Sequence, residues 1–310
     1  MKIMITGGAG FIGSHLAEFF LLKKYQVIIV TRKDSKNLKS IRKKVKIEKF
    51  DVTNHEKIKK SILKNKPDII IHLAGNTSHS KSFEFPIKDL ESNAKSTLEI
   101  LEILRRFHPK CKFILGSTFV VVGKPRKLPV NEKTVCNPST IYGADKLVSE
   151  NYARIYNSVY GLHTNIFRIT NSFGPREKTI ANKNALNFLI YNAFKGNEVT
   201  IFNKGKIFRD IIYIDDVTSG IFTICKKGKP GEVYWISSGR KTWFSDIAGI
   251  LKNETGCKIL YVKTPTYTKK VDVGNFVVDN SKLKKLGWKP KISVNVGISK
   301  TIDYFKKSHF

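Results

Sequence analysis

The stretch ITGGAGFIGSHL at residues 5–16 decides the fold of this chain of 310 residues. It follows an apolar strand pattern and opens an amphipathic helix pattern, and its glycines Gly7, Gly10 and Gly13 stand three residues apart. Glycine lets the backbone turn tightly and approach a pyrophosphate closely, while the first turn of a helix supplies free N–H donors and a partial positive charge. A strand, a glycine loop and a helix in this order predict a dinucleotide-binding unit.

Strand-like and helix-like segments alternate through the first half of the chain. This order is typical of βαβ units and predicts an α/β fold, a Rossmann-like doubly wound parallel sheet. Ligands of such sheets bind at the carboxyl ends of the strands, so motifs that directly follow strands carry the most information. Strands are expected at 3–6, 27–31, 45–49, 69–73, 112–115 and 164–168, and helices at 12–22, 55–63, 87–107 and 140–160.

The second half of the chain is less regular and has no linker-like tract. We expect a dinucleotide-binding domain at 1–170 and a smaller C-terminal α/β lobe for the substrate at 171–310, with the chain crossing between them near 208–235. Helices are expected at 184–194, from 215, at 244–254 and at 294–305, and strands at 198–201, 208–213 and 231–236.

The composition argues against several other classes of protein. No segment reaches the ~20 apolar residues of a membrane helix, and the N-terminus lacks a signal-peptide layout, so we expect a cytoplasmic protein with no membrane role. The net charge of +31 comes mostly from dispersed lysines, which favours a solvated basic surface over a nucleic-acid site and is compatible with an acidic substrate. Histidines and cysteines lack ligand spacing, so neither a metal nor a disulfide framework is expected; the cysteines are Cys111, Cys136, Cys225 and Cys257.

The end of the second expected strand bears on the choice of cofactor. NAD sites usually place a carboxylate there for the ribose 2′-hydroxyl, whereas NADP sites place an arginine for the 2′-phosphate. This chain has Thr31, Arg32 and Lys33, and no carboxylate before Asp34. Because arginine occurs only ten times in the chain, Arg32 favours NADP over NAD. The alternative is that Arg32 is simply solvated.

Tyr142 and Lys146 form a Y-x-x-x-K pair within STIYGADKLVSE at 139–150. Residues four apart share a helix face, so we expect the ammonium beside the phenol. A free tyrosine titrates near ~10, and a neighbouring ammonium and the positive ring of an oxidised nicotinamide both favour the phenolate. Tyr142 is therefore a candidate general acid/base. The spacing alone is common by chance in a lysine-rich chain.

The stretch GSTFVVVG at 116–123 directly follows the fifth expected strand, and Tyr142 lies on the next helix. With these features the chain resembles the extended short-chain dehydrogenase/reductase family, in particular its nucleotide-sugar epimerases and dehydratases of the UDP-glucose 4-epimerase type. The resemblance covers nearly the whole chain in the family's order. Its further motifs are HLAG at 72–75, YGADK at 142–146, FRITNSFGP at 167–175, FRDIIYIDDV at 208–217 and DNSKLKKLGWKP at 279–290.

The resemblance implies which residues bind the cofactor, NADP or NAD. Asp51 and Val52 would contact the adenine, and Asn93 would support the ends of the fourth and fifth strands. The full set comes from the glycine loop, the strand ends and the catalytic pair: Gly7, Gly10, Phe11, Ile12, Gly13, Thr31, Arg32, Asp51, Val52, Leu73, Ala74, Gly75, Asn93, Tyr142 and Lys146.

The resemblance also implies a nucleotide-diphosphate sugar as the substrate. Thr118, with Tyr142, would bind the reacting sugar oxygen, and Asn171 and Arg209 would hold the diphosphate, since the guanidinium fork suits phosphate oxygens. Two positions depart from the family pattern. Thr31 stands where many members carry the ribose-binding acid, and no second phosphate-binding arginine is found near 269–275, where Lys269 or Lys270 would have to replace it.

The residues after Thr118 bear on the reaction. Dehydratases of this family resemble Thr-Asp-Glu here, because the elimination of water needs an added acid and base, whereas this chain has Phe119 and Val120. A 4,6-dehydratase is therefore disfavoured, and the overall resemblance favours a 4-epimerase. An NADPH-dependent 4-ketosugar reductase, which Arg32 favours, is the alternative. A non-catalytic dinucleotide sensor is a second alternative, although such proteins usually lose the tyrosine or the lysine.

Two further features are open to more than one interpretation. Cys136, in the loop before Tyr142, is either an acid/base for epimerisation next to a ketone or an ordinary loop thiol. The helices at 87–107 and 140–160 carry more apolar residues than one buried stripe needs, which predicts a C₂ homodimer unless loops of the same chain cover them. These residues are Leu98, Ile100, Leu101, Ile103 and Leu104 on the first helix and Leu147, Val148, Tyr152, Ile155 and Tyr156 on the second.

Overall fold

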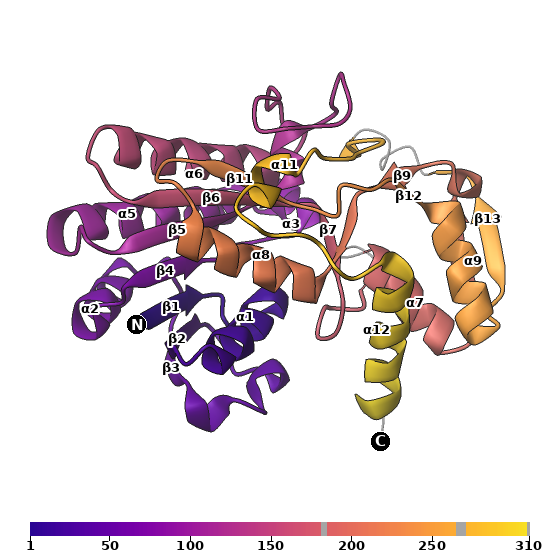
Figure 1. The fold of residues 1–310 in the computed structure, drawn as a ribbon, viewed down its shortest axis with the longest axis horizontal. Coiled ribbons are helices and arrows are strands. Elements are labelled where there is room, and N and C mark those ends of the chain that lie inside the picture. Colours follow the sequence, from indigo (N-terminus) through magenta and orange to yellow (C-terminus); the bar gives the residue numbers. More distant parts are fainter. Residues whose placement is uncertain (181–184, 265–270, 309–310) are drawn as a thin grey trace.

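The fold is a parallel sheet with helices on both faces (Figure 1). It is described by a computed structural model for residues 1–180, 185–264 and 271–308. The strand order β11-β6-β5-β4-β1-β2-β3 reverses between β1 and β4, which confirms the predicted doubly wound, Rossmann-like α/β fold. The seven strands are β1 Lys2–Thr6, β2 Gln26–Thr31, β3 Lys46–Lys49, β4 Ile69–His72, β5 Lys112–Thr118, β6 Thr164–Ile169 and β11 Val233–Ile236.

Successive residues of each strand pack against different helices, because neighbouring side chains of a strand point to opposite faces. Ile3 and Ile5 of β1 share a core with α1 and α8, whereas Met4 between them packs with α2, α5 and α6. Both faces are therefore buried, as is usual for a parallel sheet. The five helices are α1 Phe11–Leu22, α2 His55–Asn65, α5 Ser96–Phe107, α6 Ile141–Ser158 and α8 Ile214–Lys227.

A second group of elements lies beside the sheet, on the right in Figure 1. Its helices are α7 Ala185–Phe194, α9 Phe244–Thr255 and α12 Val294–Ser308. Its strands form three pairs: β7 Asn171–Phe173 with β10 Ile211–Tyr213, β8 Val199–Phe202 with β13 Ile259–Val262, and β9 Phe208–Arg209 with β12 Thr242–Trp243. Shorter helical turns are α3 His79–Glu84, α4 Pro86–Leu90, η1 Lys36–Leu38, η2 Arg42–Lys44, η4 Phe119–Val122, η5 Asn203–Gly205 and α11 Ser281–Lys284.

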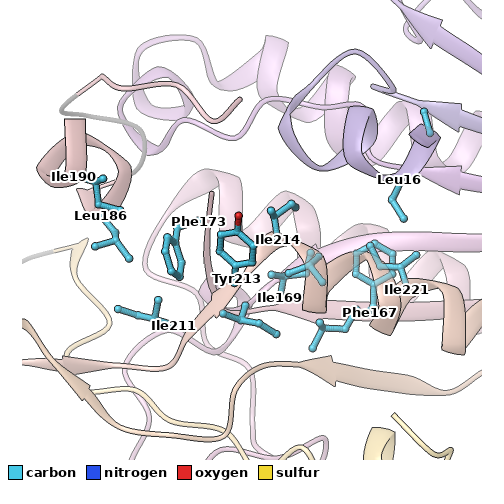
Figure 2. Packing of buried hydrophobic residues seen from close by; sticks show 14 of the residues in the cluster. Leu16, Phe167, Ile169, Phe173, Leu186, Ile190, Ile211, Tyr213, Ile214 and Ile221 are labelled. Carbon is cyan, nitrogen blue, oxygen red and sulfur yellow. The ribbon is translucent and has the colours of Figure 1, made fainter. Parts of the chain in front are cut away.

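One apolar core runs from the sheet into this second group. In Figure 2 it passes from Phe167 on β6 through Phe173 and Tyr213 to Leu186 and Ile190 on α7, and all five residues are buried. The chain returns to the main sheet at β11, which pairs with β6. The division into units at 1–170 and 171–310 remains a prediction, because the core has no break at residue 170.

The helix expected at 87–107 is not regular. A π-helical segment, η3 at Glu91–Lys95, separates α4 from α5. Hydroxyl groups bond to its carbonyls: Thr97 donates to the carbonyl oxygen of Asn93 at 2.7 Å, and Ser149 of α6 donates to the same oxygen at 3.1 Å. Such bonds compete with the helical ladder and distort it. The apolar pattern alone does not indicate this interruption.

The single strand expected at 208–213 is also interrupted. Asp210 separates β9 from β10, and its buried carboxylate accepts hydrogen bonds at 2.7–3.2 Å from the backbone and hydroxyl of Ser238 and from the N–H groups of Gly239 and Val278. Burial raises the pKa of Asp210 to about 6, while these donors act in the opposite direction. Within the described residues, no helix is both long and apolar enough to cross a bilayer.

Candidate active site

The glycine loop lies against the end of β4. A Cβ added to Gly7, whose φ is +68°, would come within 2.9 Å of the Ala74 nitrogen, and one added to Gly13 would come within 2.5 Å of the Gly7 carbonyl oxygen. The helix α1 starts after Gly10 with no side-chain cap and no acidic residue in its first turn. Its first N–H groups, on Phe11, Ile12 and Gly13, therefore suit a pyrophosphate.

The end of β2 lies close to this loop. Asn37 donates a side-chain hydrogen bond of 3.2 Å to the carbonyl of Ala9, and the Thr31 hydroxyl donates to the carbonyl of Lys33. The guanidinium of Arg32 is 3.6 Å from the carboxylate of Asp51, with 73% of the arginine side chain exposed. The predicted residues Thr31, Arg32 and Asp51 thus lie at one edge of the sheet, and Val52 follows them in the core. Asn37 carries no signal in the sequence.

A chain of hydrogen bonds connects β1 to β4. The backbone N–H groups of Leu73 and Ala74 each donate to the Thr6 hydroxyl oxygen at 3.2 Å. The hydroxyl hydrogen is therefore directed at Nδ1 of His72, 2.7 Å away, so the ring carries its proton on Nε2, which faces the Ser96 hydroxyl at 3.4 Å. Burial, together with the nearby charge of Lys146, lowers the pKa of His72 to about 3.

Asn93, which lies in η3, braces the loop after β4. A Cβ on Gly75, whose φ is +156°, would come within 2.2 Å of the Asn93 side-chain oxygen. The Asn93 amide donates to the carbonyl of Asn76 at 3.3 Å and to the carboxylate of Asp89 at 3.1 Å. These contacts place Asn93 beside the loop after β4, and its role in supporting the ends of the fourth and fifth strands and in binding the cofactor stays a prediction.

The predicted catalytic side chains lie together. Thr118 ends β5, Tyr142 and Lys146 stand one turn apart in α6, and all three are at least nine-tenths buried. Burial raises the pKa of Tyr142 to about 12, with a hydrogen bond from Thr118 acting the other way. Burial also lowers the pKa of Lys146 to about 8, opposed by Glu150 and Asp89. The expected lowering of the phenol pKa is thus outweighed by burial in the protein alone.

The surroundings of Thr118 are apolar on the side that follows it in the chain. Residues 119–122 form η4, where Val120, Val121 and Val122 are buried. The ring of Phe119 meets that of Phe276 with a centroid distance of 5.2 Å. Neither residue 119 nor residue 120 brings a proton donor or acceptor side chain to the site.

The two predicted diphosphate ligands differ in the hydrogen bonds that they make within the protein. Asn171 begins β7, and its buried side-chain oxygen has no hydrogen-bond partner among the described residues. Arg209 in β9 donates to the carboxylate of Asp272 and to the carbonyl of Gly274. Lys269 and Lys270, expected to replace a second arginine, lie outside the described residues.

The thiol of Cys136 is half-buried, and burial raises its pKa, with Arg168 acting in the opposite direction. Its sulfur is 3.7 Å from the carbonyl oxygen of Thr134. A thiol that keeps its proton near neutral pH is a poor base. These surroundings favour the interpretation of Cys136 as an ordinary loop thiol.

Three polar residues near the catalytic pair are not predicted from the sequence. The ring of His79 stands edge-on to that of Tyr142, with 5.5 Å between centroids. Asp89 and Asp145 are buried carboxyls on α4 and α6. The spacing of Asp89 and Asn93 and the place of Asp145 in YGADK are visible in the sequence, but their burial is not.

Comparison with known proteins relates this geometry to a family. Residues 4–301 match the family model described as GDP-mannose 4,6 dehydratase. The chain is 29% identical over 309 residues to a putative UDP-glucose 4-epimerase of Methanocaldococcus jannaschii, covering 99% of both chains. It is 31% identical to a dTDP-D-glucose 4,6-dehydratase of Dictyostelium discoideum, covering 99% of this chain and 82% of that protein.

Solved structures agree with this relationship. A UDP-glucose 4-epimerase of Thermotoga maritima, solved with UDP-glucose, is 30% identical with a TM-score of 0.93, and all of both chains is covered. A UDP-glucose 4-epimerase of Thermus thermophilus, solved with NAD, is 25% identical with a TM-score of 0.88, covering 99% of both chains.

We predict that Thr6→Val destabilises the protein while Thr6→Ser does not. Valine leaves Nδ1 of His72 and the N–H of Ala74 without their partner, and an unpaired buried polar group costs about 1–3 kcal/mol. Serine keeps the hydroxyl. Urea unfolding of the three proteins measures the difference, and equal midpoints for Thr6→Val and the parent would refute the assigned hydrogen-bond chain.

Proposed function

Because the chain belongs to the GDP-mannose 4,6-dehydratase family of NAD-dependent nucleotide-sugar epimerases and dehydratases, we propose that it is a nucleotide-sugar 4-epimerase. The observation that carries this proposal is that Thr118, Tyr142 and Lys146 are buried together and that only apolar residues, at 119–122, directly follow Thr118. These three side chains provide for hydride transfer with one proton, and no second acid/base pair stands at positions 119 and 120.

The glycine loop and the N-terminus of α1 would hold the pyrophosphate of the cofactor, which when bound takes a hydride from the sugar C4 and returns it. Tyr142 would accept the proton of the C4 hydroxyl and give it back, since its phenol is the titratable group beside Thr118. The Thr118 hydroxyl would hydrogen-bond the same sugar oxygen. The ammonium of Lys146 would favour the phenolate while the proton is away.

Asn171 and Arg209 are the proposed ligands of the substrate diphosphate. The side-chain oxygen of Asn171 has no partner among the described residues, and rotating the amide by half a turn puts its N–H₂ group in that place, where it would donate to a phosphate oxygen. Arg209 must exchange its bonds to Asp272 and Gly274 for phosphate oxygens. With Asn171 and Arg209 both beyond residue 170, we assign substrate binding to a lobe at 171–310.

An NADPH-dependent 4-ketosugar reductase is the second candidate, because Arg32 favours it. The exposed pair of Arg32 and Asp51 is worth at most about 1 kcal/mol, so a 2′-phosphate competes for the guanidinium easily. A 4,6-dehydratase is disfavoured by Phe119 and Val120, although dehydratases are among the relatives. A non-catalytic sensor is the remaining alternative, and the presence of both Tyr142 and Lys146 argues against it.

Incubation of the purified protein with UDP-glucose in heavy water tests the proposal. A 4-epimerase forms UDP-galactose without added reductant, approaches the same product ratio from either sugar, and incorporates no deuterium at C4 because the hydride returns. The same assay with dTDP-, GDP- and CDP-sugars identifies the base. Turnover only of a 4-ketosugar with NADPH would favour the reductase, and absence of all turnover would favour the sensor.

We predict that Tyr142→Phe binds cofactor normally and loses turnover by about 10²–10⁴-fold, the range expected when a general acid/base is removed. Steady-state kinetics and a cofactor titration measure the two effects. Tyr152→Phe, a half-buried tyrosine of the same helix, is the matched control and should keep its activity. Near-parental turnover of Tyr142→Phe would overturn the assignment.

We predict that NADP binds more tightly than NAD and that Arg32→Ala removes the preference, because the guanidinium is the group available to a 2′-phosphate. Calorimetric titration of both cofactors gives the affinities. Arg240→Ala, which removes an exposed arginine elsewhere, should leave the preference unchanged. Equal affinities in the parent protein would mean that Arg32 is a surface charge without this role.

We still propose a homodimer, although fewer exposed apolar residues support it than the sequence predicts. The apolar residues that the sequence analysis named on the first helix are mostly covered by the chain itself. Leu98 is partly buried, and the others are buried: Ile100, Leu101, Ile103 and Leu104. On α6, Tyr156 is buried and Leu147, Val148 and Tyr152 are partly buried. Ile155 is 48% exposed, and Val159, just beyond α6, is 65% exposed.

We predict that light scattering at micromolar concentration gives twice the 35.2 kDa mass of one chain. A charge placed in an apolar interface is costly, so Ile155→Asp should shift the protein toward the monomer. Lys57→Asp, an exposed position on α2, is the control. A single-chain mass for the parent protein would rule the dimer out.

A further inference from the structure

Asp89 is a buried carboxylate next to the catalytic pair. It lies on α4 with 1% of its surface exposed and accepts hydrogen bonds from the side-chain amides of Asn76 and Asn93. Both donors are neutral, and no ion pair of Asp89 occurs within residues 1–180, 185–264 and 271–308. Its negative charge acts to raise the pKa of both Tyr142 and Lys146, which lie on the facing helix α6.

Asp145 faces Asp89 from α6, directly before Lys146. It is 7% exposed, and its Oδ2 has no N–H or hydroxyl donor among the described residues. A buried carboxylate oxygen without a donor is costly, and two carboxyls in contact avoid that cost by sharing one proton. Burial raises the pKa of Asp145 to about 7, and the hydrogen bond with Asp89 adds to this. Because Asp89 accepts hydrogen bonds from two side-chain amides, we place the negative charge of the carboxyl pair on Asp89.

Two carboxylates oppose the effect of burial on the pKa of Lys146, Glu150 more strongly than Asp89, and of these two only Asp89 has no ion pair among the described residues. On α6, Glu150 is bound by Arg168 at 2.7 and 2.9 Å and is also approached by Arg154. His79 on α3 and His72 on β4 are the remaining titratable neighbours, and burial lowers the pKa of both rings. The lysines of the adjoining turns are exposed: Lys88 over the ring of Phe85, and Lys95 beside Glu99.

We propose that Asp89 and Asp145 share one proton and act as positioning residues that hold Lys146 in its ammonium form beside Tyr142. The hydrogen bond between the carboxyls joins α4 to α6 at the residue before Lys146. The single charge left on the pair offsets the burial of the ammonium. The shared proton stands independently of the reaction, whereas its effect on turnover rests on the proposed function.

The pair has a defined effect on stability. Asp145 keeps its proton in the folded protein up to about pH 7 but loses it near pH 4 when unfolded, so the folded state binds more protons between these values. Stability therefore falls as pH rises through this window, and the loss persists above it. Asp145→Asn cannot titrate, and its amide still donates to Asp89.

Thermal unfolding from pH 5 to pH 8 tests the shared proton without any substrate. Relative to the parent, the melting temperature of Asp145→Asn should rise by about 3 °C or more across this range, given the usual relation between stability and melting temperature. Glu84→Gln removes one exposed charge from α3 and should show a constant difference. A constant difference for Asp145→Asn as well would overturn the shared proton.

The pH dependence of kcat tests the effect on Lys146. Asp89→Asn alone leaves the single charge to Asp145, so the double variant Asp89→Asn/Asp145→Asn is used to remove it. Loss of the charge lowers the pKa of Lys146, so the alkaline limb of the double variant should move down by about one pH unit, with kcat at pH 8 about tenfold lower and KM within twofold. Asp145→Asn should keep the parental kcat at pH 6 and lose the ionisation near pH 7.

A profile of the double variant that superimposes on the parent's would refute the role of the pair in holding Lys146 charged. A double variant that fails to fold still leaves the decision to Asp145→Asn, whose amide preserves the contact. Absence of turnover in the parent would instead refute the proposed epimerase function, and the unfolding series would decide on the carboxyl pair alone.

Discussion

The close approach of the loop after β1 to the loop after β4 constrains everything around the candidate active site. Gly7 has room for a hydrogen atom and nothing larger where it meets Ala74, and the Thr6 hydroxyl is bonded by two backbone N–H groups of the second loop. Because β1 and β4 are central neighbours, this contact fixes the point at which the strand order reverses. A neutral, buried His72 completes the contact and ties it to the helix behind.

Two buried charged clusters then hold the outer parts against this centre. Glu150 of α6 accepts hydrogen bonds from Ser117 on β5 and Arg168 on β6, so the helix that carries Tyr142 is bound to the strand that carries Thr118. Asp210 binds the backbone at Ser238 and Val278, joining three distant segments. Removing one partner of such a buried cluster typically costs about 3–5 kcal/mol, because the remaining charge stays buried without compensation.

The sequence is sufficient for the parts that depend on local pattern. Glycine spacing, apolar periodicity and the Y-x-x-x-K pair predict the sheet, its helices and the grouping of Thr118 with Tyr142. It is insufficient where tertiary contacts decide. Asp210 interrupts an apolar strand pattern because distant donors bind it, and Asp89 and Asp145 resemble ordinary surface acids until the fold buries them. The pKa of Tyr142 rises where the sequence predicts that it falls, since burial is invisible in a sequence.

The π-helical segment at Glu91–Lys95 has a consequence for how this chain tolerates insertions and deletions. It inserts one extra residue per turn where α4 meets α5, so Asp89 and Asn93 present their side chains to each other across a widened turn. Because the π-helical turn already absorbs its extra residue, deleting a single residue would restore a regular helix with little rotation of α4 relative to α5. A one-residue deletion in this segment would therefore act mainly by displacing Asn93 from Gly75 and Asp89, rather than by changing the path of the flanking helices.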